Sequence, residues 1–381
     1  MNKEIYLDYA ANTPVDREVL RAFDEATMQY FGNPNSTHKL GLEAKNRIDE
    51  ASSNIMNCIQ SELHLNGNFE MIYTSGSSES NNLAIKGVCR TYRENGRHII
   101  TSFLEHSSVS GPLSSLKDQG YEVDVVNILP NGKVDVQAIR ELMRKDTVLV
   151  SICSVDGELG TIQPIEEIAQ IVKEYPNCMF HVDATQSIGK IKMNFENVDL
   201  ITFAPHKFYG LNGFGALLKR KEIVLEPLIH GGTSTSLYRS GTPVTGQIVA
   251  MEKALELAIQ EEDNRFAYVS SLNRYLRENL AKYDKVQINS LDERNPYILN
   301  LGVKEVKATD FKKELEKYGV CVSIKSACSV TATPSRSVMA MTKDRKRAFS
   351  SWRISLSHLT TKEELEKFME IFDVCYQSMT T

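Results

Sequence analysis

The 381-residue sequence lacks the features of several protein classes. Its seven cysteines are an odd number, and none of them shows the C-x-x-C or zinc-ligand spacing typical of a disulfide framework or a zinc site. Acidic and basic side chains number 49 and 44, so the net charge is −5, and no long basic block is present to bind nucleic acid. We therefore expect free thiols, no metal site and chemistry on a small molecule.

Long apolar runs are absent as well. No uncharged apolar run reaches the roughly 18 residues of a membrane span. Glu4 and Asp8 stand near the N-terminus, where a signal peptide needs an apolar core. The sequence thus predicts a protein of the reducing cytoplasm that has neither a membrane partner nor a nucleic-acid partner.

Between about residues 70 and 220, short β-branched and apolar runs alternate with helical stretches. This alternation predicts an α/β fold, in which helices cover both faces of a mainly parallel sheet. In an open sheet of this kind the ligand lies beyond the carboxyl ends of the strands. The expected strands end near residues 74, 100, 126, 152, 182 and 203.

Long helices with apolar faces replace this alternation past residue 244. A final helix is expected after Thr361, because Thr361 and Glu364 have the spacing of a capping box. The pattern indicates a second, smaller α+β domain. The predicted elements and domains are two strands at 298–302 and 320–323, a helix at 311–317, a large domain of residues 16–258, and a small domain of residues 1–15 and 259–381.

Three segments at expected strand ends carry candidate chemistry. The small and hydroxyl residues from Thr74 to Asn82 suit a phosphate at a helix N-terminus, although a serine-capped helix start has the same pattern. Asp183 ends an apolar strand and either pairs with the protonated nitrogen of a bound heterocycle or caps the next turn. Lys207 has apolar neighbours that favour a neutral, Schiff-base-forming amine, the alternative being a surface lysine. Pyridoxal phosphate requires a phosphate cradle, a carboxylate and a lysine, so the three segments together favour this cofactor.

Nine short motifs, spread over nearly the whole chain, occur in the order of one known family. They are Tyr6-Leu7-Asp8-Tyr9-Ala10-Ala11-Asn12-Thr13-Pro14, Phe31-Gly32-Asn33-Pro34, Thr74 to Asn82, Glu105-His106, His181 to Gln186, His206-Lys207, Arg239-Ser240-Gly241-Thr242, Ser326-Ala327-Cys328 and Trp352-Arg353-Ile354-Ser355-Leu356. On these motifs the chain resembles the NifS/IscS-like cysteine desulfurases of the class V aminotransferase superfamily, which are pyridoxal-phosphate enzymes of fold type I. The resemblance implies a large domain with a mainly parallel seven-stranded sheet and a smaller α+β domain.

The resemblance also implies roles for individual residues. Lys207 would bind the cofactor as a Schiff base and remove the α-proton of the substrate, Asp183 would pair with the pyridine nitrogen, and His106 would stack on the ring. Cys328 would attack the sulfur of L-cysteine, which yields a persulfide and L-alanine. A sulfur-acceptor protein, iron–sulfur cluster or thio-cofactor biosynthesis, and a homodimer with shared active sites are further implications. The other implied contacts are Gln186 to the ring hydroxyl, Ser77, Ser78 and His206 to the phosphate, Thr242 to the phosphate from the neighbouring subunit, Asn33 beside the substrate, and Arg353 to the substrate carboxylate.

Three positions depart from the family pattern near the cofactor. Gly157 stands where an asparagine usually contacts the ring hydroxyl, and Ala204 where a serine usually contacts the phosphate. Lys325 replaces a small residue close to Cys328, whose thiol pKa it would lower. Two alternatives therefore stay open: another class V reaction, such as transamination, selenocysteine lysis or β-elimination, and a non-catalytic binding or assembly subunit. The remaining cysteines, interpreted as packing residues, are Cys58, Cys89, Cys153, Cys178, Cys321 and Cys375.

Overall fold

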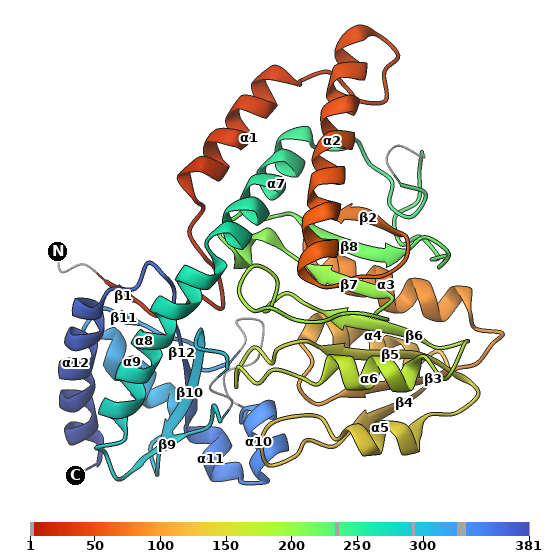
Figure 1. Cartoon of the computed structure of the whole chain (residues 1–381). Helices are drawn as coiled ribbons and strands as arrows, with labels where there is room; N and C mark the ends of the chain where they lie inside the picture. Colours follow the sequence, from red (N-terminus) through yellow and green to blue (C-terminus); the bar gives the residue numbers. More distant parts are fainter. Residues whose placement is uncertain (1–3, 233–235, 292–293, 326–332, 381) are drawn as a thin grey trace.

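The predicted central sheet is present in the computed structural model, which describes residues 4–232, 236–291, 294–325 and 333–380. Its strands lie in the order β2-β8-β7-β6-β5-β3-β4, and neighbours are parallel except where β8 runs antiparallel to β2 and β7 (Figure 1). The mainly parallel, seven-stranded sheet is therefore confirmed. The strands are β2 (Phe69–Thr74), β3 (His98–Ser102), β4 (Glu122–Val126), β5 (Thr147–Cys153), β6 (Met179–Asp183), β7 (Leu200–Phe203) and β8 (Gly215–Arg220).

Helices cover both faces of this sheet (Figure 1). Consecutive strand residues point to opposite faces, so Ile99 and Leu217 pack with α3 and α4, whereas Ile100 and Leu218 pack with the helices of the other face. Both faces are thus apolar, as a parallel sheet requires. The helices are α3 (Ser77–Thr91) and α4 (Ser107–Lys117) on one face, and α1 (Arg17–Gln29), α2 (Lys39–Glu62), α5 (Val136–Leu142), α6 (Ile165–Val172) and α7 (Thr245–Gln260) in the core of the other.

Strand β8 was not anticipated from the sequence. Its short apolar run is followed by the charged residues Lys219 and Arg220, yet Lys219 is fully buried. The Lys219 ammonium forms an ion pair with Glu70 of β2 and donates a hydrogen bond to the Ile223 carbonyl oxygen, 2.6 Å away. A buried charge is tolerated when it is paired in this way, and its partners come from a neighbouring strand and the following turn, which local pattern cannot reveal.

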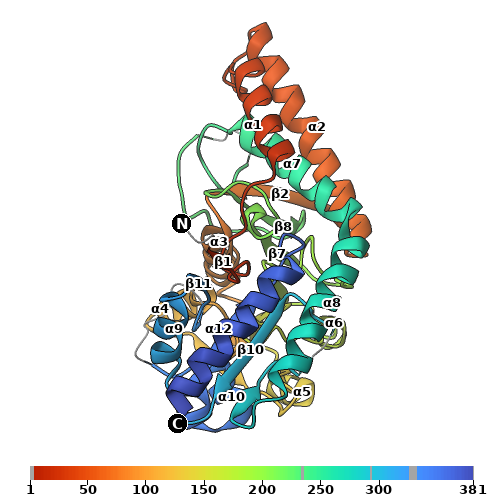
Figure 2. The same cartoon turned by 90° about the vertical axis from the view of Figure 1, so that its left-hand side faces the viewer.

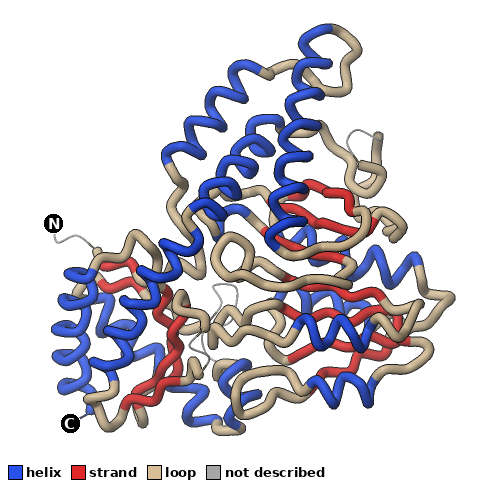
Figure 3. The backbone as a smooth tube through the Cα atoms, viewed as in Figure 1, coloured by secondary structure: helices blue, strands red, loops and turns tan. Residues whose placement is uncertain are grey.

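A smaller body of strands and helices lies beside the sheet (Figures 1 and 2). In it β10 pairs antiparallel with β12 and β9, and β1 pairs in parallel with β11. Helices lie on its outer side, and its strands lie toward the large sheet (Figure 3). The elements are β1 (Ile5–Tyr6), α8 (Glu262–Leu280), β9 (Val286–Ile288), β10 (Ile298–Val303), α9 (Ala308–Glu316), β11 (Val320–Cys321), α10 (Arg336–Thr342), α11 (Arg345–Ser350), β12 (Ser351–Ser355) and α12 (Lys362–Thr380).

The local predictions for this part agree closely with the structure. The Thr361 N–H donates to Glu364 Oε2 and the Glu364 N–H donates to Thr361 Oγ1, both at 3.1 Å, so the capping box at the start of α12 is confirmed. The strand expected at 320–323 is shorter and ends at Cys321. One apolar core combines residues 5–10 with residues 269–376. The same core also includes Val155 and Ile191, while Val338 and Ala348 pack in the core of the large sheet, so the predicted domain division remains a proposal.

None of the helices in the described ranges is both long and apolar enough to cross a membrane.

Gly189 packs where a side chain has no room. Its φ of +72° favours glycine, and a Cβ there would lie 2.9 Å from Ala258 Cβ and 3.0 Å from Phe208 Cβ. We expect Gly189→Ala to lower the free energy of unfolding by about 2–4 kcal/mol, because left-handed backbone strain and overpacking add. Gly213 is the matched control, since it has the same backbone conformation, φ +73°, with nothing within 4 Å of the position that a new methyl group would take. Urea denaturation of Gly189→Ala and Gly213→Ala separates the cost of backbone strain, which both variants have, from the cost of overpacking, which only Gly189→Ala has. Equal losses of unfolding free energy would contradict the packing argument.

Candidate active site

A cavity of about 580 Å³ opens at the carboxyl ends of β2, β3, β5, β6 and β7, between the large sheet and the smaller body. Residues from both bodies line it, which agrees with the location expected for a ligand in an open α/β sheet. Eight of the residues singled out from the sequence meet there: Ser77, Ser78, His106, Asp183, Gln186, His206, Lys207 and Arg353.

One end of the cavity is formed by the start of α3. Gly76 is the N-cap residue, its φ of +151° favours glycine, and no side chain caps this helix among the described residues. The first N–H groups of the helix therefore point toward the cavity together with the Ser77 and Ser78 side chains. The alternative of a serine-capped helix start does not hold here, and the arrangement suits a bound phosphate.

An ion pair fixes the loop before this helix. Arg239 Nε lies 3.0 Å from Glu79 Oε1, and the Ser75 N–H donates to Glu79 Oε2 at 2.7 Å. Burial alone would raise the pKa of Glu79, but the hydrogen bonds from Arg239 and Ser75 outweigh it and lower the pKa. The carboxylate thus stays charged and ties the segment around Arg239 to the phosphate end of the cavity.

Asp183 ends β6 and accepts hydrogen bonds from neutral groups. Asn81 Nδ2 donates to Asp183 Oδ2 at 2.8 Å, and Thr185 donates to Oδ1 through its hydroxyl at 2.5 Å and its N–H at 3.0 Å. Within the part of the chain that the structure describes, no lysine, arginine or histidine forms an ion pair with Asp183. Its negative charge therefore remains to be matched by a cationic group in the cavity, which fits a protonated ring nitrogen.

Sequence reasoning missed Asn81. Its amide nitrogen donates to both Asp183 Oδ2 and Ser108 Oγ, 2.9 Å away, and Ser108 Oγ lies 2.8 Å from His106 Nδ1. One amide thus connects the carboxylate with the histidine that is expected to stack on the cofactor. The available signal was helical spacing, because Asn81 lies four residues after Ser77 on the same face of α3.

His106 is the N-cap residue of α4, and its Nδ1 accepts the Ser108 N–H at 3.2 Å. Burial lowers the pKa of His106, and the positive charges of Lys207 and Arg336 lower it further against the opposing effect of Asp183. We therefore expect a neutral ring whose Nε2 carries the proton.

Lys207 closes the short 3₁₀ helix η1 (Pro205–Lys207) that follows β7. Its ammonium donates to the carbonyl oxygens of Ala10 at 2.8 Å and Ala11 at 2.7 Å, so the N-terminal segment lies directly beside it. Burial and the charges of Lys207 and Lys190 lower the pKa of the neighbouring His206 to about 4. His206 is thus a neutral hydrogen-bonding group near pH 7, beside the lysine amine.

Arg353 also lines the cavity, where two contacts hold its guanidinium. Its Nη1 donates to the Gly157 carbonyl oxygen at 2.6 Å, and its Nη2 forms an ion pair with Asp8 Oδ1 at 2.8 Å. The buried Nε has no hydrogen-bond partner among the described residues. Because Nε is buried, an N–H for a substrate carboxylate would come from the second hydrogen of Nη1 or Nη2.

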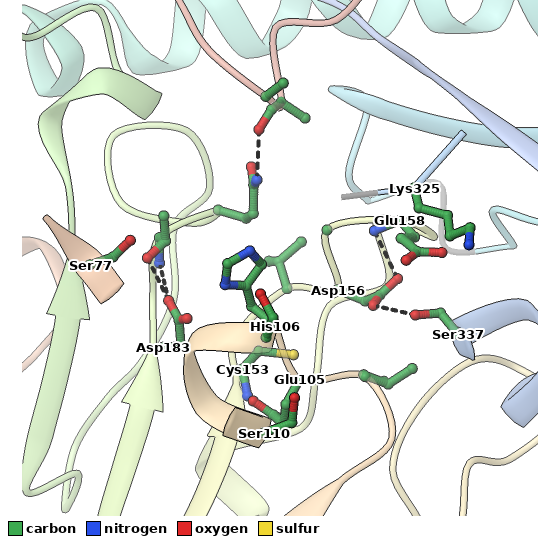
Figure 4. Close-up of a pocket in the computed structure, with 18 of the residues that line it drawn as sticks. Ser77, Glu105, His106, Ser110, Cys153, Asp156, Glu158, Asp183, Lys325 and Ser337 are labelled. Atoms are coloured by element: carbon green, nitrogen blue, oxygen red, sulfur yellow. Dashed lines mark hydrogen bonds between the residues drawn. The ribbon is translucent and has the colours of Figure 1, made fainter. Parts of the chain in front are cut away.

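Acidic side chains gather on the far side of the cavity from Ser77 and Asp183 (Figure 4). Asp156 accepts from Ser337 Oγ at 2.9 Å, and Glu158 accepts from Ser335 Oγ at 2.5 Å, so the start of α10 is fastened to the loop after β5. Burial and the adjacent Glu158 raise the pKa of Asp156 to about 7. These cross-domain contacts were not apparent from the sequence, because their partners are about 180 residues apart.

Glu105, next to His106, lies at the base of the same wall. Its Oε1 accepts from Ser102 Oγ at 2.7 Å and from the Cys153 N–H at 3.0 Å, while its Oε2 has no partner among the described residues. Burial raises the pKa of Glu105 to about 8 in spite of these hydrogen bonds. The Cys153 thiol also lines the cavity, and burial together with the charge of Glu105 raises its pKa well above the ordinary value.

The raised pKa of Glu105 predicts a pH-dependent stability. The pKa of Glu105 is about 8 in the folded state, whereas its ordinary value is 4.5. The contribution of the protonated acid to stability is therefore fully present below pH 4.5 and is lost as the pH rises toward 8. We expect the unfolding free energy of the parent, measured relative to Glu105→Gln, to fall by a few kcal/mol between about pH 5 and about pH 9. Glu141→Gln makes the same substitution at an exposed residue and serves as control. Parallel pH profiles for the parent and Glu105→Gln would disprove the expectation.

The departures from the family pattern have distinct structural settings. A side chain at Gly157 would have its Cβ 3.8 Å from Gln186 Nε2, so the space of an asparagine is open beside the predicted ring-hydroxyl donor. Ala204 is fully buried ahead of η1 and offers no donor. Lys325 lines the acidic side of the cavity, where its ammonium donates to Thr333 Oγ1 at 2.8 Å.

Two predicted residues are not brought into the cavity by this single chain. Asn33 lies in the loop between α1 and α2, where it accepts the Asn35 N–H at 3.0 Å, and Thr242 is exposed. Neither lines the cavity. Cys328 lies outside the described residues; in the sequence it stands between Lys325 and Thr333, which both line the cavity.

Comparisons with known proteins give one consistent family. The family model described as aminotransferase class-V matches residues 5–368. The chain is 38% identical to a cysteine desulfurase IscS from Dictyoglomus turgidum, covering 100% of this chain and 96% of that relative, and 38% identical to a mitochondrial cysteine desulfurase from Arabidopsis thaliana, covering 97% and 82%. A solved NifS-like protein superposes with a TM-score of 0.89 at 32% identity, covering 98% of this chain and 99% of that one. A NifS-like protein from Rickettsia africae gives a TM-score of 0.86 at 28% identity, covering 98% and 100%.

Proposed function

The chain belongs to the cysteine desulfurases of the class V aminotransferase family, and from this premise we propose that it converts L-cysteine to L-alanine with transfer of the sulfur to Cys328. The observation that carries the proposal is the single cavity in which Lys207, Asp183 and the uncapped start of α3 meet. These groups fit pyridoxal phosphate, the cofactor of the family, because they supply an amine, an unmatched carboxylate and a phosphate cradle.

The residues of this chain divide the binding between them. Ser77, Ser78 and His206 would hold the phosphate, and Gln186 would donate to the ring hydroxyl. His106 would cover the ring, and its neutral state adds no charge there. The bound cofactor supplies an electron sink that makes the α-proton of the amino acid acidic. The Arg353 guanidinium would hold the substrate carboxylate.

Two groups of the chain would then act on the substrate. Lys207 Nζ takes the proton from the α-carbon. The Cys328 thiolate attacks the substrate sulfur, the bond between that sulfur and the β-carbon breaks, and its electron pair stays with the carbon, which is protonated as alanine forms. The product on the protein is a persulfide, whose outer sulfur passes to a thiol acceptor. This chemistry needs reduced thiols, which supports a place in the cytoplasm.

The direct test quantifies L-alanine and sulfide from L-cysteine in the presence of a thiol reductant. Equal amounts of alanine and sulfide are the expected result. Pyruvate released together with sulfide would replace the proposal by β-elimination, and 3-mercaptopyruvate without sulfide would replace it by transamination. Protein that forms no visible cofactor band after incubation with pyridoxal phosphate would instead be a non-catalytic relative.

We also propose a homodimer with shared active sites. The hairpin of α1 and α2 projects beyond the sheet (Figure 1). Met28 and Phe31, near the end of α1, are 74% and 72% exposed, and Leu40 and Leu42, at the start of α2, are exposed as well. Exposed apolar side chains in such numbers are typical of an interface. A second copy that covers this hairpin would bring its Thr242 to the phosphate end, as the family pattern implies.

Sedimentation velocity tests the dimer. The double variant Met28→Asp/Phe31→Asp should sediment as a monomer and bind pyridoxal phosphate less tightly, because Thr242 of the second copy is then missing. Val374→Asp introduces one aspartate at a 50% exposed apolar residue of α12 and should leave the dimer intact. A parent protein that sediments as a monomer would overturn the proposal of shared sites.

A further inference from the structure

Lys190 is a buried amine that the proposed reaction does not use. It is 8% exposed, and its Nζ donates a hydrogen bond to Gln186 Oε1 at 2.9 Å. In the described ranges no carboxylate forms an ion pair with it. Both residues belong to the turn after β6, in which the Lys190 N–H donates to the Ser187 carbonyl oxygen at 3.0 Å. The close packing at Gly189 keeps this turn against the core.

Gln186 in turn connects Lys190 with Lys207. Gln186 Nε2 donates to the Ala10 carbonyl oxygen at 3.0 Å, and the same oxygen accepts from Lys207 Nζ at 2.8 Å. A space of about 10 Å³, lined by all four residues, lies between them and holds at most one water molecule. Buried lysines normally have a carboxylate partner, so an amine that faces only an amide oxygen requires an explanation.

The surroundings of Lys190 are positive or neutral. Lys207 and Arg353 act on it electrostatically, the nearby His206 is neutral, and the small space is also lined by Tyr9, Tyr209 and Tyr297. Burial and the charges of Lys207 and Arg353 lower the pKa of Lys190 to about 7. The amine therefore remains a hydrogen-bond donor to Gln186 whether or not it carries a charge.

We propose that Lys190 is a positioning residue that fixes the side-chain amide of Gln186, so that the Gln186 nitrogen and not its oxygen faces the cofactor ring. An amide has one accepting oxygen and a nitrogen with two donor hydrogens. Lys190 occupies the oxygen, and Ala10 takes one hydrogen, which leaves the other for the ring hydroxyl. The inference rests on the proposed function only in that the cofactor binds at Lys207.

Removal of the donor should change the bound cofactor and not only the rate. In Lys190→Met the amide is free to turn its oxygen toward the ring oxygen, where the two acceptors repel. We expect the pH midpoint of the cofactor's visible band to rise by roughly one unit and the affinity for pyridoxal phosphate to fall roughly fivefold. Lys190→Arg keeps a donor and should stay close to the parent in both measurements.

A double-variant comparison separates positioning from a direct effect of charge. If Lys190 acts through Gln186, Lys190→Met causes no further shift of the band in a Gln186→Ala background. A shift of the same size in that background would overturn the proposal, because Lys190 would then act on Lys207 by charge alone. Unchanged titration of Lys190→Met in the Gln186-containing protein would overturn it as well.

The matched control is Lys192→Met, two residues away, where an exposed ammonium pairs with Asp263 at 2.8 Å. It should leave the band and the cofactor affinity unchanged. If Lys190→Met does not fold, Lys190→Gln, which keeps a donor without a charge, takes its place and should resemble the parent; a full shift in that variant would contradict the inference. A parent that binds the cofactor but forms no alanine refutes only the proposed reaction, whereas a parent with no visible band refutes both.

Discussion

Replacement of Cys328 by alanine should lower alanine and sulfide formation from L-cysteine by roughly three orders of magnitude or more, with the cofactor's visible band retained. The thiolate is the proposed nucleophile, and no other group then accepts the substrate sulfur. Lys325, which lines the cavity near this position, would favour the ionised thiol. The measurement is a turnover assay with both products quantified, together with an absorbance spectrum of each variant.

Cys153, a thiol that lines the cavity, provides a control for this result. Cys153 lines the same cavity, but burial and the neighbouring acids Glu105 and Asp156 raise its pKa well above the ordinary value, which makes it a poor nucleophile. Cys153→Ala should therefore change turnover by less than about tenfold. Cys58→Ala, on α2 and outside the cavity, should have no effect. Parent-like activity of Cys328→Ala would contradict the role of Cys328 as the nucleophile. Loss of activity only in Cys153→Ala would assign that role to Cys153.

The second large effect is expected at Lys207. Lys207→Ala should abolish the visible band that forms with pyridoxal phosphate and should lower turnover by roughly three orders of magnitude or more. The reason is that the amine both binds the cofactor and moves the α-proton in the proposed reaction. Spectra recorded during titration with the cofactor, combined with the turnover assay, measure both effects.

Lys207→Arg tests whether a positive charge at this position is enough to form the visible cofactor band. The guanidinium keeps a positive charge beside the carbonyl oxygens of Ala10 and Ala11, yet it does not react with an aldehyde under these conditions. This variant should therefore resemble Lys207→Ala in its spectrum. A normal visible band in either variant would show that another amine binds the cofactor, and the buried Lys190 would be the first candidate.

Much of the fold could be predicted from the sequence because its signals are local. The strands from β2 to β7 have short β-branched runs, and the capping box of Thr361 and Glu364 needs only four consecutive residues. By contrast, β8 was missed because the partner of its buried Lys219 lies on another strand. A pattern along the chain cannot show which charge a distant residue will neutralise.

The same distinction holds for the site. Ser77, Asp183 and Lys207 were found because each lies at or shortly after the end of a strand, and strand ends of a parallel sheet meet at one edge. The contacts of Asp156 with Ser337 and of Glu158 with Ser335 were missed, since they depend on how two bodies of the fold meet. Asn33 and Thr242 do not line the described cavity in one chain, and the roles predicted for them would need a second copy.

The contacts of the N-terminal segment also bear on how the protein is synthesised. Ala10 and Ala11 hold Lys207, yet this segment is itself fixed by β11 and by the ion pair of Asp8 with Arg353, which are made last on the ribosome. A nascent chain that stops before residue 320 already contains Ala10, Ala11 and Lys207 but lacks β11 and Arg353, which help to fix the N-terminal segment beside the lysine amine. Loading of the cofactor is therefore expected to follow translation, and its visible band marks chains that were completed and folded.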